Sequence, residues 1–202
     1  MTDAMGRAER ATLGRPVATS HAAIEQAAFR LFAARGFDGT TLDAIAREVG
    51  VGRRTLFRYF ESKNDIPWGQ FDRSLDGFRD ILDAMPTDVP LWEAVHRGVV
   101  RFNEFPDDAS PSHVTRMRLI LQTPALQAHS VLRYAQWRQV IAEYVAARLD
   151  LEPADVLPQT VGHVSLGLAL SAYTAWLDDP SRPLPELLDL SLRELRRYLG
   201  AV

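Results

Sequence analysis

Apolar side chains recur every three or four residues through most of the chain, and this spacing is the feature that most constrains its fold. A period of this kind places apolar groups on one face of an α-helix. In the second part of the chain it predicts helices near residues 91–105, 111–122, 124–149, 154–178 and 184–199, with prolines between them. No stretch shows the sustained alternation of apolar and polar residues that is typical of half-buried strands. We therefore expect an all-α protein without a sheet.

The first part of the chain predicts two helices before residue 50. One begins at Thr19, keeps three-to-four apolar spacing for about 17 residues and ends near Arg35, where a glycine follows. The other is short, starts after Thr41 as its N-cap and is terminated by Gly50. Both helices therefore have recognisable start and stop signals.

A tight glycine-rich turn at residues 50–52 leads into a third, arginine-rich helix at residues 53–60. Ser62 and Asp65 then form the pattern of a capping box. This pattern predicts that a long helix starts there and continues to Met85.

These segments predict two domains and an arm. We expect a flexible arm at residues 1–18, an N-terminal three-helix helix-turn-helix domain at residues 19–64, and a larger C-terminal helical domain at residues 65–202. Residues 1–65 carry 10 basic and 8 acidic side chains, whereas residues 66–202 carry 13 and 18. A basic head on an acidic body suits a protein that contacts phosphate at one end only.

The composition excludes several classes of protein. The chain has no cysteine, which excludes disulfide scaffolds, thiolate zinc sites and cysteine nucleophiles. Its longest mostly apolar run, residues 161–176, is shorter than the roughly 20 residues that span a bilayer. The first residues lack the apolar core of a secretory signal. We therefore expect a cytoplasmic protein without a membrane partner.

Two short helices joined by a tight turn form the layout that places a recognition helix in the major groove of DNA. The arginines of the third helix fit guanine edges or phosphates through two parallel hydrogen bonds. The predicted DNA-binding residues are Thr40, Thr41, Arg53, Arg54, Thr55, Phe57, Arg58, Tyr59 and Lys63. The alternative is a helical bundle whose arginines are only solvated, because the chain has 22 arginines and a single lysine.

The same segment resembles the signature of the TetR family of bacterial regulators over about 45 residues. The matching residues are Phe37, Thr40-Thr41-Leu42, Ile45-Ala46, Val49-Gly50-Val51-Gly52, Thr55-Leu56-Phe57, Tyr59-Phe60 and Lys63. Residues 63–72, together with Arg53 and Arg54, also resemble the subgroup found with mycofactocin gene clusters. The resemblance implies a dimeric repressor that binds double-stranded palindromic operator DNA and releases it when a ligand fills the C-terminal domain. Phe57 occupies a position at which many members of the family have tyrosine.

The resemblance also implies a ligand pocket among the helices of the C-terminal domain. Aromatic residues at helical spacing build ordinary cores as well, so only a few should line a cavity. The predicted pocket residues are Trp68, Phe71, Trp92, Phe102, Phe105, Met117, Leu121 and Trp137. Arginines on the same helices suit a small-molecule effector that is a long anionic amphiphile, such as a long-chain acyl-CoA.

Small residues between positions 163 and 172 predict a face where two helices approach closely, which suits a dimer seam together with the last helix. The predicted homodimer interface residues are Ser165, Ala169, Ala172, Leu188, Leu192 and Leu195. The alternative is ordinary packing of this face inside one chain.

The sequence contains no complete enzyme signature. Glu93 and His96 match one Glu-x-x-His unit of di-iron bundles, which require two such units, and no second copy exists. The turn at Gly50 and Gly52 begins like a dinucleotide fingerprint, but Thr55 occupies the position of the third glycine. We predict no catalytic residue, no metal site and no cofactor. A helical-bundle metalloenzyme and a constitutive DNA-binding protein without an effector are the alternatives.

Overall fold

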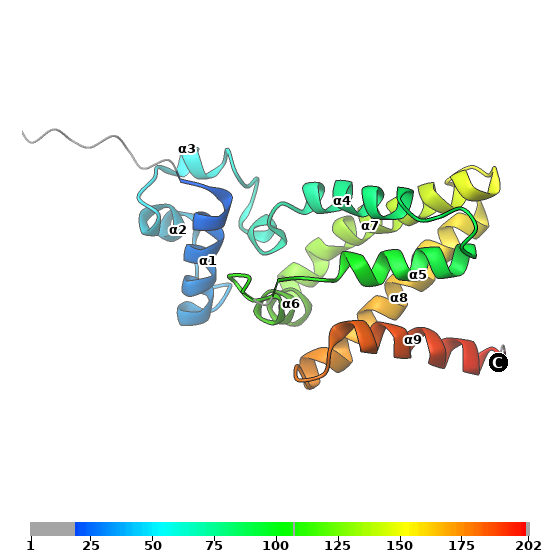
Figure 1. The fold of residues 1–202 in the computed structure, drawn as a ribbon. Coiled ribbons are helices and arrows are strands. Elements are labelled where there is room, and N and C mark those ends of the chain that lie inside the picture. The colour runs from blue at the N-terminus through cyan, green and yellow to red at the C-terminus, as the bar shows by residue number, and fades with distance from the viewer. Residues whose placement is uncertain (1–18, 107, 201–202) are drawn as a thin grey trace, which may run out of the picture.

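The computed structural model describes residues 19–106 and 108–200, and within them every regular element is a helix (Figure 1). This confirms the prediction of an all-α fold for that part of the chain. The predicted arm at residues 1–18 lies outside the described residues. Because strands are absent from these two ranges, tertiary contacts arise from helix packing and from the loops between helices.

The N-terminal helices begin and end at the signals that the sequence predicts. They are α1 (His21–Arg35), α2 (Leu42–Glu48) and α3 (Arg53–Leu56). The Ser20 hydroxyl accepts a hydrogen bond from the first turn of α1, and Thr41 caps α2 in the same way. Gly50 has φ 70°, in the region that favours glycine, and it ends the turn after α2. Helix α3 is shorter than predicted, and hydrogen-bonded turns continue it to Phe60.

The long helix predicted from Ser62 to Met85 is two elements. A 3-10 helix, η1 (Lys63–Trp68), precedes α4 (Phe71–Asp83). Gly69 separates them with φ 60° and ψ −133°, a conformation that an α-helix cannot contain. The sequence signal for this break is the glycine two residues after Pro67. The capping box is present as predicted, with Ser62 N–H donating to Asp65 Oδ2 over 2.9 Å.

The C-terminal domain continues with α5 (Leu91–Phe102), α6 (His113–Gln122), α7 (Pro124–Leu149), α8 (Val156–Asp178) and α9 (Leu184–Tyr198). Figure 1 shows α7 and α8 as long elements that cross the domain, with α4 and α5 beside α7 and α9 against α8. The predicted helix at 91–105 ends earlier, because Asn103 turns back and its Nδ2 donates to Val99 O over 2.7 Å. A loop from Asn103 to Ser112 then leads to α6.

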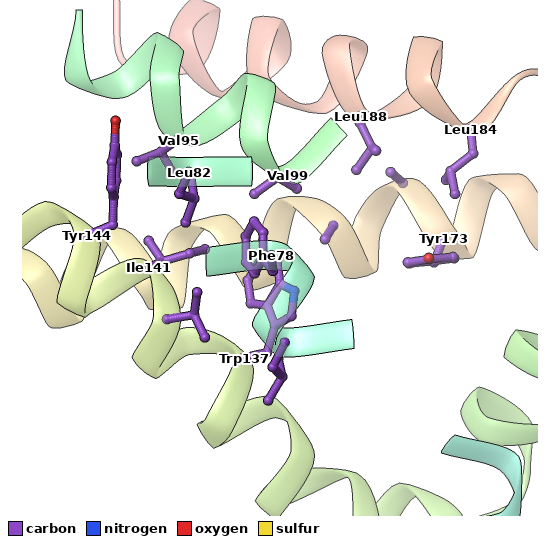
Figure 2. Close-up of a cluster of buried hydrophobic side chains, with 14 of the residues drawn as sticks. Phe78, Leu82, Val95, Val99, Trp137, Ile141, Tyr144, Tyr173, Leu184 and Leu188 are labelled. Carbon is purple, nitrogen blue, oxygen red and sulfur yellow. The ribbon is translucent and has the colours of Figure 1, made fainter. Parts of the chain in front are cut away.

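Two clusters of buried side chains stabilise the fold. In the larger cluster, Phe78 of α4 stacks on Trp137 of α7 with ring centroids 5.4 Å apart (Figure 2). The smaller cluster holds α1, α2 and α3 together around Ile24 and Leu56, and it also takes in Ile66 of η1 and Leu126 of α7. Because η1 and α7 contribute to this core, the helix-turn-helix domain packs directly against the C-terminal domain.

Among the described helices, none is long and apolar enough to cross a bilayer.

Candidate DNA interface and ligand cavity

The exposed side of α3 and of the turn that follows it carries the cations that a recognition helix needs. Arg53, Arg54 and Arg58 are all exposed, and Thr55 between them is half-buried. The opposite face is anchored in the core by Leu56, of which only 1% is exposed. This separation of faces is the arrangement that allows a short helix to enter a groove without losing its own packing.

Two contacts of Arg53 hold its guanidinium over the surface of the motif. The group lies 5.4 Å from the ring centroid of Phe57, and Nη1 lies 3.6 Å from Asp43 Oδ2 on α2. Phe57 is 42% exposed, so it offers a flat apolar surface beside the arginine. The Arg53–Asp43 pair is exposed and weak, so a DNA phosphate or guanine can replace it.

Three residues predicted to contact DNA have their polar groups engaged inside the protein. Thr40 is buried, and its hydroxyl donates to Gly36 O over 2.9 Å, which corrects its assignment as a DNA contact. Lys63 Nζ donates to Phe37 O and to Thr40 O, over 2.7 and 3.0 Å. Tyr59 Oη donates to Thr19 O over 2.7 Å. Thr41 remains exposed at the start of α2.

A cavity of about 490 Å³ lies in the C-terminal domain, a size typical of small-molecule sites. Six of the eight predicted pocket residues line it: Trp68, Phe71, Phe102, Phe105, Met117 and Trp137. Buried Met117, Ile120 and Ala169 form its floor, whereas exposed Ser74 and Arg101 mark its mouth. The floor is therefore apolar, and the mouth carries polar groups.

The other two predicted pocket residues lie elsewhere. Trp92 is 49% exposed, and the Arg196 guanidinium covers its ring at 4.6 Å. Leu121 packs against the larger core. The helical period placed both on plausible faces, but it does not distinguish a cavity wall from a core or from a surface contact.

An ion pair that the sequence analysis missed joins the DNA-binding domain to the cavity. Glu25 of α1 accepts a hydrogen bond from Arg116 Nη2 of α6 over 2.5 Å, and Arg116 Nη1 donates to Pro67 O of η1 over 2.6 Å. Glu25 and Arg116 both line the cavity and are mostly buried. Gly69 lies against them, since a Cβ there would come within 3.1 Å of the Glu25 carboxylate. We call the Glu25–Arg116–Pro67 contact the α1–α6 clasp.

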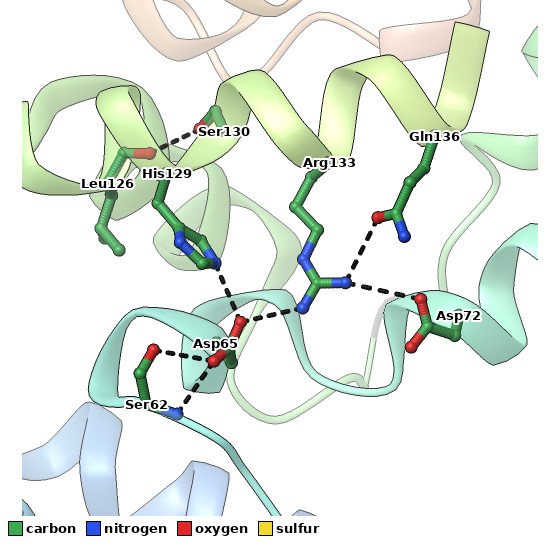
Figure 3. Close-up of polar contacts among 8 residues, drawn as sticks. All are labelled: Ser62, Asp65, Asp72, Leu126, His129, Ser130, Arg133 and Gln136. Atoms are coloured by element: carbon green, nitrogen blue, oxygen red, sulfur yellow. Dashed lines mark hydrogen bonds and ion pairs between the residues drawn. The ribbon is translucent and has the colours of Figure 1, made fainter. Parts of the chain in front are cut away.

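A second polar cluster joins the end of the helix-turn-helix domain to α7 (Figure 3). Asp65 Oδ1 lies 2.8 Å from Arg133 Nη2 and 2.9 Å from His129 Nε2, while Oδ2 accepts from Ser62. Burial alone would raise the pKa of Asp65. The hydrogen bonds from Ser62 and Arg133 and the neighbouring His129 outweigh burial and hold the pKa below its usual value. Asp65 is therefore a carboxylate at neutral pH.

Three of the six residues predicted for the dimer face are buried inside the chain. Ala169 and Ala172 are buried inside the chain, and Leu188 of α9 is also part of the larger core. The two alanines therefore pack against helices of the same chain, which is the alternative that the sequence leaves open. Ser165, Leu192 and Leu195 are half-buried. The exposed face of α8 instead carries Val156, Thr160, Val164, Gly167 and Ser171.

The Glu-x-x-His unit takes part in ordinary ion pairs. His96 Nε2 lies 2.7 Å from Asp189 Oδ1 of α9, and Glu93 pairs with Arg97 one turn along α5. Among residues 19–106 and 108–200, no three histidines or carboxylates gather as a metal site. The contact between His96 and Asp189 joins α5 to α9.

Comparisons with known proteins agree with this geometry. Residues 24–66 match the model described as bacterial regulatory proteins, tetR family, and residues 89–200 match the MftR C-terminal domain. The chain is 46% identical over 176 residues to MftR of Mycobacterium tuberculosis, described as a mycofactocin biosynthesis transcriptional regulator, covering 87% of this chain and 89% of the relative. The chain belongs to the TetR family. It is a TetR-family DNA-binding transcriptional regulator with an MftR-type C-terminal domain, and the family is one of regulators, not of enzymes.

More distant proteins share parts of the sequence or the fold. TcmR of Streptomyces glaucescens is 31% identical over 133 residues, covering 62% of this chain and 59% of TcmR. The structure of Thermus thermophilus FadR in complex with lauroyl-CoA matches with a TM-score of 0.56 and 21% identity, covering 86% of this chain and 92% of that one. A SmeT–triclosan complex matches with a TM-score of 0.58 and 19% identity, covering 86% and 90%. At these identities the structures show a shared fold.

Proposed function

We propose that this regulator is a repressor that binds a palindromic operator as a homodimer and leaves it when a small molecule fills the cavity. One observation carries the proposal: the cavity wall includes Glu25, which belongs to α1 of the DNA-binding domain. A ligand in the cavity therefore touches the domain that binds DNA. A ligand shifts a conformational equilibrium only through different contacts in the two states, and the α1–α6 clasp supplies such a contact.

The DNA-binding part of the proposal rests on the exposed side of α3 and of the turn that follows it. Arg54 and Arg58 reach base edges or phosphates, while Arg53 does so after leaving Asp43. In a two-fold dimer the two α3 helices enter successive major grooves, with half-sites about 34–36 Å apart. Such a regulator acts on the chromosome, and we place it in the cytoplasm. The similarity to MftR favours mycofactocin biosynthesis genes as targets.

The proposed effector is a long-chain acyl-CoA. The apolar floor at Met117 and Ile120 suits an acyl chain, and Arg101 at the mouth suits an anionic head group. The structure of FadR, which shares the fold, is a complex with lauroyl-CoA, and that of SmeT is a complex with triclosan, so proteins of this fold bind molecules with large apolar parts.

Two steps test the proposal. DNA fragments bound by the protein are first selected from a random pool at a fixed salt concentration, and we expect a palindromic sequence to be enriched. Lauroyl-CoA is then added to the complex with that sequence, and operator affinity should fall at least tenfold. Enrichment of no sequence would contradict the regulator proposal. Enrichment without any response to acyl-CoA of several chain lengths would favour a constitutive DNA-binding protein.

A further inference from the structure

Three polar side chains form a hydrogen-bonded relay in the wall of the cavity. They are Asn103 at the end of α5, Tyr173 of α8 and His113 at the start of α6, and all three line the cavity. Tyr173 Oη lies 2.6 Å from Asn103 Oδ1 and 2.7 Å from His113 Nε2. Asn103 and Tyr173 are buried, and His113 is half-buried. The relay therefore joins three helices at one place on the wall.

The direction of each hydrogen bond follows from the donors available. Asn103 Nδ2 donates to Val99 O over 2.7 Å, which fixes the amide so that Oδ1 faces Tyr173. Tyr173 has a single proton and gives it to Oδ1, because an amide oxygen only accepts. The Tyr173 oxygen must then accept from His113 Nε2–H. The relay thus fixes the tautomer of His113, with its proton on Nε2 and a lone pair on Nδ1.

The surroundings of His113 keep the imidazole neutral. Burial, aided by the positive charge of Arg116, lowers the pKa of His113 to about 3. Its second nitrogen, Nδ1, is therefore an acceptor at any pH at which the protein is expected to work. No hydrogen bond formed within residues 19–106 and 108–200 reaches Nδ1.

His113 lies next to an exposed residue near the mouth of the cavity. The imidazole stacks on Phe105, with ring centroids 3.6 Å apart, and Phe105 is 43% exposed in the loop before α6. Met117, one turn further along α6, is buried in the floor. His113 therefore lies between the exposed mouth and the apolar floor, where the polar neck of an amphiphile would lie if its tail filled the floor.

We propose that His113 Nδ1 accepts a hydrogen bond from the bound effector, and that the effector class is an amphiphile with a hydroxyl or amide N–H at its neck. This inference rests on the proposed function, because it assigns ligand chemistry to the same cavity. A free carboxylate is disfavoured at this place, because it has no proton to donate and would face the lone pair. The pantetheine arm of an acyl-CoA carries both amide and hydroxyl donors, whereas a free fatty acid carries neither at neutral pH.

Four probes with the same twelve-carbon tail test the inference: 1-dodecanol, N-dodecylacetamide, dodecyl methyl ether and dodecanoate. Binding is followed through the fluorescence of Trp68 and Trp137, which line the cavity. We expect the alcohol and the amide to bind about tenfold more tightly than the ether, which leaves Nδ1 unsatisfied, and than dodecanoate. In His113→Phe, which keeps a flat ring against Phe105, the preference should fall below twofold. Tyr134→Phe, which removes another hydroxyl from the same cavity, is the matched control and should keep it.

A second measurement tests the relay without any ligand. The ¹⁵N resonances of the His113 imidazole should show a neutral ring protonated on Nε2, and Tyr173→Phe should release this preference. Protonation on Nδ1 in the unaltered protein overturns the inference. Equal binding of the alcohol and the ether also overturns it, while leaving the ligand-responsive proposal intact. If none of the four probes binds, the proposed effector cavity fails together with the inference.

Discussion

At the scale of single residues, Arg58 and Lys63 carry the same charge but have different surroundings. Arg58 is exposed in the turn that follows α3, whereas Lys63 lies 4.2 Å from the Phe37 ring centroid and donates to two backbone carbonyls of the turn before α2. We predict that Arg58→Ala flattens the dependence of log operator affinity on log salt by about one, with little change in stability. Lys63→Ala should instead lower the free energy of unfolding by about 2 kcal/mol.

Salt titration of operator binding and urea unfolding separate the two variants. Arg73→Ala, an exposed residue on α4 away from α3, is the control for a lost surface charge. If Lys63→Ala left the stability unaltered and flattened the dependence of log operator affinity on log salt by about one, the lysine would bind phosphate, as the sequence predicts.

The sequence allowed the exposed face of α3 to be predicted, because a helix of known register separates its arginines from Leu56. It did not allow prediction of what Thr40 and Lys63 contact, since their carbonyl partners come from a turn whose shape depends on packing. Glu25 was missed for a related reason, as its partner Arg116 lies 91 residues further along the chain. The available signal was a carboxylate beside Ile24 on the apolar side of α1.

At the scale of elements, helix existence and order followed from periodicity, but the division between η1 and α4 did not. Ser62 and Asp65 form the predicted capping box, yet the helix that they start ends at Gly69. The break allows α1, η1 and α6 to meet in the clasp. Pro67 O lies within hydrogen-bond distance of Arg116, and the absence of a side chain at Gly69 leaves room for the Glu25 carboxylate.

We predict that the clasp couples ligand binding to DNA binding. The double variant Glu25→Gln/Arg116→Gln removes both charges together, which avoids leaving one buried charge unpaired. It should bind operator within about threefold of the unaltered protein, while the loss of operator affinity caused by lauroyl-CoA should become about tenfold smaller, a coupling of about 1.4 kcal/mol. Both quantities are measured by fluorescence anisotropy of labelled operator, with and without the ligand.

Arg79→Gln/Glu143→Gln is the matched control for this variant. It removes an ion pair, 3.5 Å between Arg79 Nε and Glu143 Oε2, that joins α4 to α7 on the surface away from α1. The control should respond to lauroyl-CoA like the unaltered protein. A clasp variant that also responds in full would show that the Glu25–Arg116 pair stabilises the fold without transmitting the signal.

At the scale of the whole molecule, the smaller core shows that the two domains are packed together at the predicted boundary and are not separated by a linker. Leu126 of α7 and Ile66 of η1 are fully buried in the core of the DNA-binding domain. A shift of α7 or η1 therefore moves α1, and the boundary predicted between residues 64 and 65 crosses a packed contact. Composition and periodicity contain no information on such contacts, because either core could have used these apolar residues.

The two faces of α8 lead to opposite predictions for assembly. Gly167 is exposed, and a Cβ added there meets nothing within 4 Å, whereas Ala169 on the inner face is buried. Members of the family are dimers, and we predict that Gly167→Glu on the outer face, flanked by exposed Val164 and Ser171, shifts sedimentation equilibrium from dimer to monomer with little change in monomer stability. Operator affinity should fall with it, because one protomer reads a single half-site.

Ala169→Val completes the comparison on the same helix. Ala169 is buried inside the chain and lines the cavity floor, so valine there should leave the dimer intact, and its steric cost should appear as a loss of at most about 1–3 kcal/mol in the free energy of unfolding. If Ala169→Val separated the dimer while Gly167→Glu did not, the seam would lie on the small-residue face expected from the sequence. The monomer would then have to open its core at α8 to pair with its partner.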